Sequence, residues 1–191
     1  MNLIEKAKEQ LRELQTCQQF ERMLKVTAIL TSLLQERNLR PVIVGGLAVE
    51  IYTRSDYTTA DIDLIIGNRE AVNSILLELG FVKEGRHWYH EQLSVSIEIP
   101  NDILEDADDD KVIELSLNDG LKVFVIGIED IILDRLRACI HWKSSSDCEW
   151  GKRMFLIHYE RLDIPYMVKQ AKIDLTVDIL NEWLKNKEIK S

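Results

Sequence analysis

The stretch PVIVGGLAVEIYTRSDYTTADIDLII, residues 41–66, decides the fold. An apolar run ends at the glycine pair 45–46, a helical pattern follows, and Asp61-Ile62-Asp63 opens a second apolar run. Because successive side chains of a strand alternate between its faces, Asp61 and Asp63 should share one face while Ile62 enters the core. Two adjacent carboxylates destabilise a strand unless water or a metal ion compensates them. The pair therefore indicates a metal site.

Composition and charge restrict the class of protein. The chain has 191 residues, 46% hydrophobic and 30% charged, which suits one globular domain or one domain with a helical appendage. Its net charge of −9 provides no general attraction to nucleic acid or anionic membranes, although a local basic groove could still accept RNA. No apolar run has the length of a membrane span, and the first ten residues have a charged helical pattern unlike a signal peptide.

The cysteines indicate a reducing compartment. Cys17, Cys139 and Cys148 are odd in number and show no disulfide framework, so we expect a cytoplasmic protein. Cys139 and Cys148, with His141 and His158, fit no familiar zinc spacing and are interpreted as buried cysteines beside surface histidines.

Hydrophobic spacing predicts an α+β fold with a small mixed sheet of about five strands, N-terminal helices and a helical C-terminal half. Residues 2–37 should form one bent helix or two helices that break near residues 16–18. The predicted strands are 42–44, 58–66, 86–91, 93–99, 112–117 and 121–126, and a further extended piece should start at 81–82. The further predicted helices are 47–53, 69–79, 128–142, 148–159, 165–172 and 175–185. We expect three regions: an N-terminal helical segment 1–40, an α/β core 41–127, and a C-terminal helical region 128–191 packed on that core.

The glycine pair and the Asp-x-Asp strand resemble the signature of the DNA polymerase β-like nucleotidyltransferase superfamily. The sequence is most similar to small prokaryotic members, the minimal nucleotidyltransferases and the AbiEii-like toxin enzymes. The pattern GGLAV…R…T.DIDL, the stretch IEIP at 97–100 and the stretch IGIEDIILDRLRA at 126–138 carry the resemblance. It implies a magnesium-dependent, or manganese-dependent, enzyme that transfers a nucleoside monophosphate from an NTP to a hydroxyl group.

The resemblance also implies roles for individual residues. Asp61 and Asp63 would hold the metal, and Glu98, on the polar face of the alternating strand LSVSIEI, would complete the site and help to deprotonate the acceptor. Hard oxygen ligands on adjacent strands suit magnesium, which retains several waters. Many superfamily members have aspartate where this sequence has Glu98.

Glycines, hydroxyls and cations would bind the triphosphate. A Gly45-Gly46 turn lets backbone N–H groups approach phosphate closely, with a helix N-terminus behind them. The remaining candidates for nucleotide binding are Arg54, Thr59, Arg135 and Lys143. In HWKSSSD, Lys143 and Asp147 correspond to a Lys-Asp motif of the superfamily whose two residues are no longer adjacent.

Several alternatives remain open. The acceptor could be RNA, a protein hydroxyl or a small molecule such as an aminoglycoside. The rival interpretation is a noncatalytic binding or regulatory module with the nucleotidyltransferase fold, in a toxin–antitoxin pair. A homodimer or a cognate partner protein is compatible with the apolar stripe of the N-terminal helices. Each glycine, carboxylate and cation could also be an ordinary turn or surface residue.

Overall fold

The computed structural model describes residues 2–188 of the chain. Contacts between residues divide it into two compact units, Met1–Ile126 and Gly127–Ser191. None of the helices described is both long and apolar enough to span a membrane.

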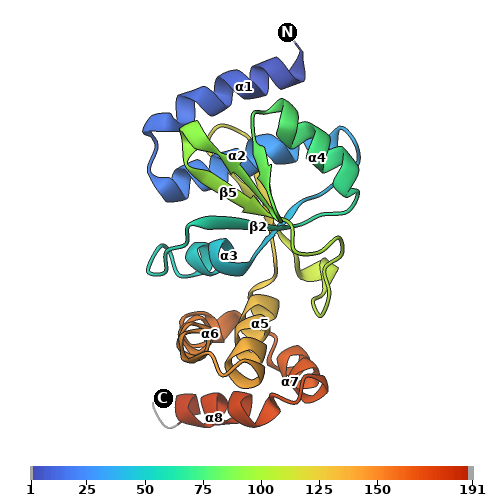
Figure 1. The fold of residues 1–191 in the computed structure, drawn as a ribbon. Helices are drawn as coiled ribbons and strands as arrows, with labels where there is room; N and C mark the ends of the chain where they lie inside the picture. Colours follow the sequence, from blue (N-terminus) through green and yellow to red (C-terminus); the bar gives the residue numbers. More distant parts are fainter. Residues whose placement is uncertain (1, 189–191) are drawn as a thin grey trace. The chain divides into compact units, whose positions relative to one another are not determined.

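The first unit is a mixed sheet with helices on both faces (Figure 1). Within residues 2–188 the sheet has seven strands in the order β3-β4-β5-β2-β1-β7-β6. The strands are β1 Val42–Val44, β2 Asp61–Ile65, β3 Val82–Glu84, β4 His87–His90, β5 Val95–Glu98, β6 Ile113–Ser116 and β7 Lys122–Val125. The helices are α1 Leu3–Glu13, α2 Gln19–Gln35, α3 Gly45–Tyr52 and α4 Arg69–Glu78, with short 3₁₀ turns at Leu14–Thr16, Glu91–Leu93 and Asp109–Lys111.

The α+β class and the helical C-terminal half are confirmed, but the sheet has more strands than the expected five or so. The edge strand β3 lies where an extended piece starting at 81–82 was predicted, and it pairs antiparallel with β4 through the turn at Gly85. Gly85 has a φ of +61°, a left-handed conformation that suits glycine in a tight turn. The three residues of β3 are all exposed, so no apolar alternation marks this strand in the sequence.

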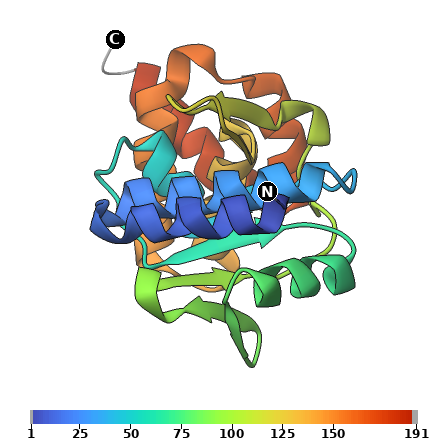
Figure 2. The ribbon, with the colours of Figure 1, turned by 90° about the horizontal axis from the view of Figure 1, so that it is seen from above.

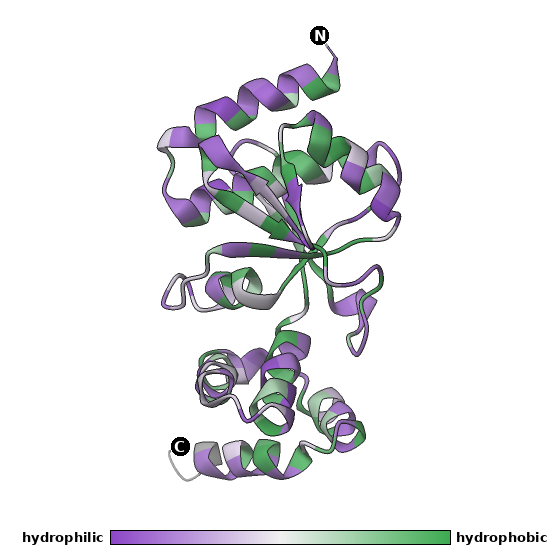
Figure 3. Ribbon diagram, in the orientation of Figure 1, coloured by the Kyte–Doolittle hydropathy of each residue, from purple (hydrophilic) through white to green (hydrophobic). Residues whose placement is uncertain are grey.

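The core lies on the face of the sheet opposite the two aspartates. Ile43, Ile62, Leu64 and Ile97 are fully buried there. Figure 1 shows α1, α2 and α4 on this side of the sheet and α3 on the other, and Figure 2 shows α1 and α2 running side by side. Hydrophobic residues follow the central strands, whereas α1 is mostly hydrophilic (Figure 3). The buried alternate residues of β2 therefore orient Asp61 and Asp63 away from the core.

The predicted break between the N-terminal helices is confirmed, and one arginine stabilises it. The Arg22 guanidinium donates to the backbone carbonyls of Leu14, Cys17 and Leu93 at 3.2, 2.6 and 2.7 Å. Carbonyls that leave the helical pattern need other donors, and a guanidinium provides several in one plane. Arg22 therefore joins the helix break to the segment that precedes β5.

The second unit contains the helices α5 Ile128–His141, α6 Ser145–His158, α7 Ile164–Ile173 and α8 Val177–Glu188, with a 3₁₀ turn at Tyr159–Arg161. Phe155 is fully buried, with its ring centroid 5.7 Å from that of Trp183. Gly151 lets α6 approach α5 closely, because an added Cβ would lie 3.1 Å from the Arg135 Cβ. Ser144 begins α6 as its N-cap, accepting the Asp147 backbone N–H at 3.3 Å.

A disulfide joins Cys139 to Cys148, with the two Cα atoms 4.7 Å apart. The prediction of cysteines without a disulfide was therefore wrong. Cys139 lies in the last turn of α5 and Cys148 in the first turns of α6, so the antiparallel helix pair brings the two side chains together. Cys17 is the free cysteine among residues 2–188.

Candidate active site

The glycine turn and the Asp-x-Asp strand meet directly. Val44 of β1 pairs with Asp63 of β2, and Gly45 begins α3 immediately after β1. A Cβ added to Gly45 would lie 2.1 Å from Oδ2 of Asp63, and the φ of Gly45 is +58°. The carboxylate of Asp63 therefore lies against the N-terminus of α3, where the helix dipole favours a negative charge. Only glycine permits this approach.

The sheet register places the third predicted carboxylate next to the second. β2 and β5 run parallel, with Asp63 paired to Glu98 and Asp61 paired to Ser96. Residues directly opposite on neighbouring strands project from the same face, so Asp61, Asp63 and Glu98 share the face opposite the core. Glu98 therefore lies on a strand that pairs directly with the strand of Asp61 and Asp63.

The carboxylate of Glu98 is occupied by basic residues from β4 and its turn. Its oxygens lie 3.0 Å from Nε of Arg86 and 3.7 Å from Nδ1 of His87, and its side chain is 15% exposed. Across residues 2–188, no group of three or more His, Cys, Asp or Glu side chains is placed to hold a metal ion. The three carboxylates thus share a face, and that of Glu98 is directed to Arg86.

The donor set of β2 nevertheless suits magnesium. Asp61 and Asp63 offer hard carboxylate oxygens on one face of one strand, and Asp61 is exposed. Magnesium is commonly bound by one or two carboxylates together with waters and substrate phosphates. Asp61 and Asp63 therefore fit the ion, and Glu98 would join them only after releasing Arg86.

The loop between α3 and β2 is held close to the second glycine. A Cβ on Gly46 would lie 2.6 Å from Oγ1 of Thr59. The backbone N–H of Thr59 donates to Oε2 of Glu50 at 3.1 Å, and its carbonyl accepts from Nε2 of Gln19 at 3.2 Å. Burial raises the pKa of the Glu50 carboxyl, and the hydrogen bond from Thr59 partly opposes that rise. The structure thus brings Gly46 and Thr59, two predicted nucleotide-binding residues, into contact.

Arg54 lies in the turn that follows α3. Its φ is +53° and that of Ser55 is +66°, so both residues adopt the left-handed conformation. Arg54 is exposed, and its guanidinium has no ion pair with any residue that the structure describes. An arginine placed in this way can bind an anion without first breaking an existing ion pair.

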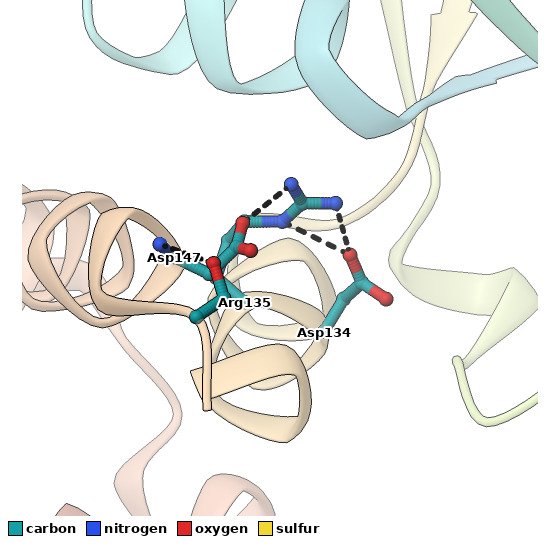
Figure 4. A network of polar contacts seen from close by, with 4 residues as sticks. Asp134, Arg135 and Asp147 are labelled. Atoms are coloured by element: carbon teal, nitrogen blue, oxygen red, sulfur yellow. Dashed lines mark hydrogen bonds and ion pairs between the residues drawn. The ribbon is translucent and has the colours of Figure 1, made fainter. Parts of the chain in front are cut away.

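The two predicted cations of the second unit differ in their surroundings. The guanidinium of Arg135 lies between Asp134, at 2.6 Å, and Asp147, at 2.8 Å, as Figure 4 shows. Lys143, next to the N-cap of α6, is exposed and has a φ of +55°. Asp147 therefore pairs with Arg135, and the two carboxylates neutralise the arginine on both sides.

Sequence reasoning missed two features of the site. The first is the buried carboxylate of Glu50, which is 3% exposed. Its signal in the sequence was a single acidic residue within the otherwise apolar helix segment GGLAVEIY. Arg86 and His87, the partners of Glu98, were assigned only to a hairpin strand. A strand register that links β4 to β5 cannot be read from local periodicity, so these contacts had no local signal.

Solved structures with a similar fold include two nucleotidyltransferase-like proteins. The crystal structure of an antigenic nucleotidyltransferase-like protein from Paracoccidioides brasiliensis has a TM-score of 0.55 and 16% identity, covering 85% of this chain and 92% of that chain. The crystal structure of ANT(2")-Ia in complex with adenylyl-2"-tobramycin has a TM-score of 0.53 and 18% identity, covering 76% of this chain and 92% of that chain. No curated protein sequence matches the chain. At these identities the structural likeness concerns the fold.

The sequence itself matches a family model over residues 21–189, nearly the whole chain. The match includes the glycine turn, the Asp-x-Asp strand, Glu98 and all four helices of the second unit. It confirms the predicted membership of the nucleotidyltransferases. The chain belongs to the family described as nucleotidyltransferase of unknown function, DUF6036.

Proposed function

We propose that this protein transfers a nucleoside monophosphate from an NTP to an acceptor hydroxyl, with a divalent metal ion. The observation that carries the proposal is the contact between Gly45 and Asp63, which places a carboxylate against a helix N-terminus on the face shared by Asp61 and Glu98. Family membership supports nucleotidyl transfer as the chemistry.

Asp61 and Asp63 are the proposed metal ligands, and Glu98 is the third carboxylate of the site. A bound magnesium or manganese ion would neutralise negative charge on the triphosphate. The backbone of Gly45 and Gly46, the hydroxyl of Thr59 and the guanidinium of Arg54 are proposed to bind phosphate oxygens. Arg135 and Lys143 stay predicted nucleotide-binding residues, and Arg135 is already paired with Asp134 and Asp147.

Glu98 is the proposed general base. The acceptor hydroxyl loses its proton to the Glu98 carboxylate as its oxygen attacks the α-phosphorus, and pyrophosphate leaves. Glu98 must first release Arg86, whose side chain is 77% exposed and can turn into solvent. In this proposal Glu98 is paired with Arg86 in the free enzyme and with the acceptor hydroxyl when substrate is bound.

A small-molecule hydroxyl is the first acceptor to test, since a protein of similar fold was crystallised with adenylyl-2"-tobramycin. RNA ends and protein hydroxyls are the other two classes. We propose a cytoplasmic location for this activity.

The test uses each of the four NTPs labelled at the α-phosphate, with Mg²⁺ or Mn²⁺. Aminoglycosides, total RNA and a protein lysate serve as separate acceptor pools. We expect label transfer from at least one NTP to one pool, lost in Asp63→Ala and in Asp61→Ala. Absence of transfer from every NTP to every acceptor pool with either metal ion, with folded protein, would refute the enzymatic proposal.

The second candidate is a noncatalytic module of a toxin–antitoxin pair, as a homodimer or with a cognate partner protein. The ion pair between Arg86 and Glu98 favours it, because the predicted third carboxylate is then engaged by an arginine. This candidate predicts a stable protein complex and no magnesium-dependent nucleotide affinity by calorimetry. The enzymatic proposal predicts nucleotide binding that depends on magnesium.

A further inference from the structure

Glu50 is a buried carboxylate with no counter-ion. Its residue is 3% exposed, and none of the described residues forms an ion pair with it. Removing a carboxylate from water without a paired cation is unfavourable, so residues of this type rarely persist in an apolar core without a specific partner. The partner here is a backbone N–H group, that of Thr59, 3.1 Å from Oε2.

The backbone of Glu50 holds the same loop from its other end. Its carbonyl oxygen accepts the backbone N–H of Ser55 at 3.0 Å, while its carboxylate accepts that of Thr59. One residue of α3 therefore anchors both ends of the segment 55–59. Arg54 directly precedes this segment and Asp61 follows it by two residues.

The anchored end of the loop lies at the glycine turn. Oγ1 of Thr59 is so close to Gly46 that a Cβ there would approach it to 2.6 Å. The same hydroxyl oxygen accepts the backbone N–H of Asp61 at 3.5 Å. A shift of Thr59 would thus move both its hydroxyl, which lies at the Gly45-Gly46 turn, and the start of β2.

We propose that Glu50 is a positioning residue, which fixes Thr59 against Gly46 so that the loop 54–61 is preorganised for the triphosphate. Glu50 itself contacts neither the nucleotide nor the reacting atoms. Preorganisation of this kind strengthens binding because the loop does not have to be ordered when the nucleotide arrives.

The distinguishing variant is Glu50→Met, which keeps a side chain of similar length and removes the acceptor. Met removes the desolvation cost of the buried carboxylate, which offsets the loss of the Thr59 hydrogen bond. We therefore expect Glu50→Met to keep or raise the melting temperature. A merely structural role for Glu50 predicts a lower one. Glu50→Gln retains an acceptor oxygen for the Thr59 N–H and should keep the wild-type nucleotide affinity and Thr59 exchange rate.

Two readouts follow the proposal. The first is calorimetric affinity for the α,β-methylene analogue of the NTP that the labelling experiment identifies, with Mg²⁺ present. We expect Glu50→Met to weaken this affinity about tenfold, the loss of one charge-assisted hydrogen bond, with Glu50→Gln within about twofold of wild type. The second is hydrogen exchange of the Thr59 amide without nucleotide, which should be faster in Glu50→Met and unchanged in Glu50→Gln.

Glu129→Met is the matched control. Glu129 is also a buried glutamate, 7% exposed, whose carboxylate accepts a backbone N–H, that of Asp163 at 2.9 Å, within the second unit. Its replacement should accelerate exchange at Asp163 and leave nucleotide affinity and Thr59 exchange unchanged.

Because this role rests on the proposed function, the outcomes are kept separate. A wild-type protein that neither binds nor transfers any nucleotide overturns the proposed function and this role with it. Wild-type binding with equal affinity in a folded Glu50→Met variant overturns the positioning role alone. Unchanged exchange at Thr59 in that variant overturns it as well, whatever the nucleotide result.

Discussion

Gly45→Ala tests the contact on which the site depends. The substitution leaves every charge in place and adds one methyl group where the structure has no space. The new Cβ would lie 2.1 Å from Oδ2 and 2.8 Å from Cγ of Asp63, and the residue would have to keep a φ of +58°. Since Cβ contacts below 3.0 Å essentially do not occur, the carboxylate must move.

The size of the effect follows from these distances. Restoring ordinary contact displaces the Asp63 carboxylate by about 1 Å, a misplacement that can lower a catalytic rate on the order of 100-fold. The left-handed backbone adds roughly 1 to 2 kcal/mol of destabilisation. We therefore expect kcat/KM for label transfer to fall about 100-fold in Gly45→Ala, far more than a destabilised but folded protein would lose.

Gly120→Ala separates the two effects. Gly120 also has a positive φ, +81°, but an added Cβ meets nothing within 4 Å. The assay is kcat/KM at saturating metal ion, with the melting temperature measured in parallel for both variants. Gly120→Ala should lose stability and keep its activity. A folded Gly45→Ala variant with wild-type kcat/KM would refute the reasoning that Asp63 is held by this turn for catalysis.

Three further perturbations address other parts of the molecule. Arg86→Ala should leave kcat within about threefold of wild type, because the ion pair with Glu98 must open for Glu98 to act, and it should change the free energy of unfolding by less than about 1 kcal/mol, because the arginine side chain is largely exposed. A loss of activity as large as that of Asp63→Ala would contradict this. The Cys139–Cys148 disulfide closes a loop with a sequence separation of 9, so its reduction should lower the free energy of unfolding of the second unit by about 2.5 kcal/mol. Denaturant titration with and without reductant measures this change, and the stability of Cys139→Ser should not depend on reductant. Burial raises the pKa of Glu50 above its ordinary value of 4.5, so Glu50 ionises in the unfolded chain first, and its contribution to stability decreases as pH rises from about 4.5 through the folded-state pKa. Glu50→Gln should therefore be more stable than wild type at neutral pH and equal to it near pH 4. A stability difference that does not depend on pH would contradict this.

The local elements of the site were predictable because their signals are local. The glycine pair ends one apolar run and the Asp-x-Asp pair opens another, so the order strand, turn, helix, strand can be read without tertiary information. Asn68 is another such case: asparagine is a favoured N-cap, and its side chain accepts the backbone N–H of Ala71 at the start of the predicted helix 69–79. The two-residue alternation of β2 likewise determines that Asp61 and Asp63 share a face.

Contacts between distant segments were not predictable in this way. The edge strand β3 has no apolar alternation, so only an extended piece starting at 81–82 was predicted there, without a partner strand. The partners of Glu98 likewise depend on which strand lies beside β5. The Cys139–Cys148 pairing depends on the α5–α6 hairpin, since neither the number of cysteines nor their spacing indicates it. Register and helix packing are collective properties, which a single segment does not contain.

Periodicity and turn chemistry act over a few residues, and they were enough to predict the α+β class, the nucleotidyltransferase signature and the common face of Asp61 and Asp63. Three contacts depend instead on the folded chain: Asp63 lies against Gly45, Glu98 is engaged by Arg86, and Glu50 reaches the Thr59 amide. Each of these contacts joins residues brought together by strand pairing or by the loop that returns to α3. Their distances depend on how the whole sheet is packed, and no local pattern of residues carries that information.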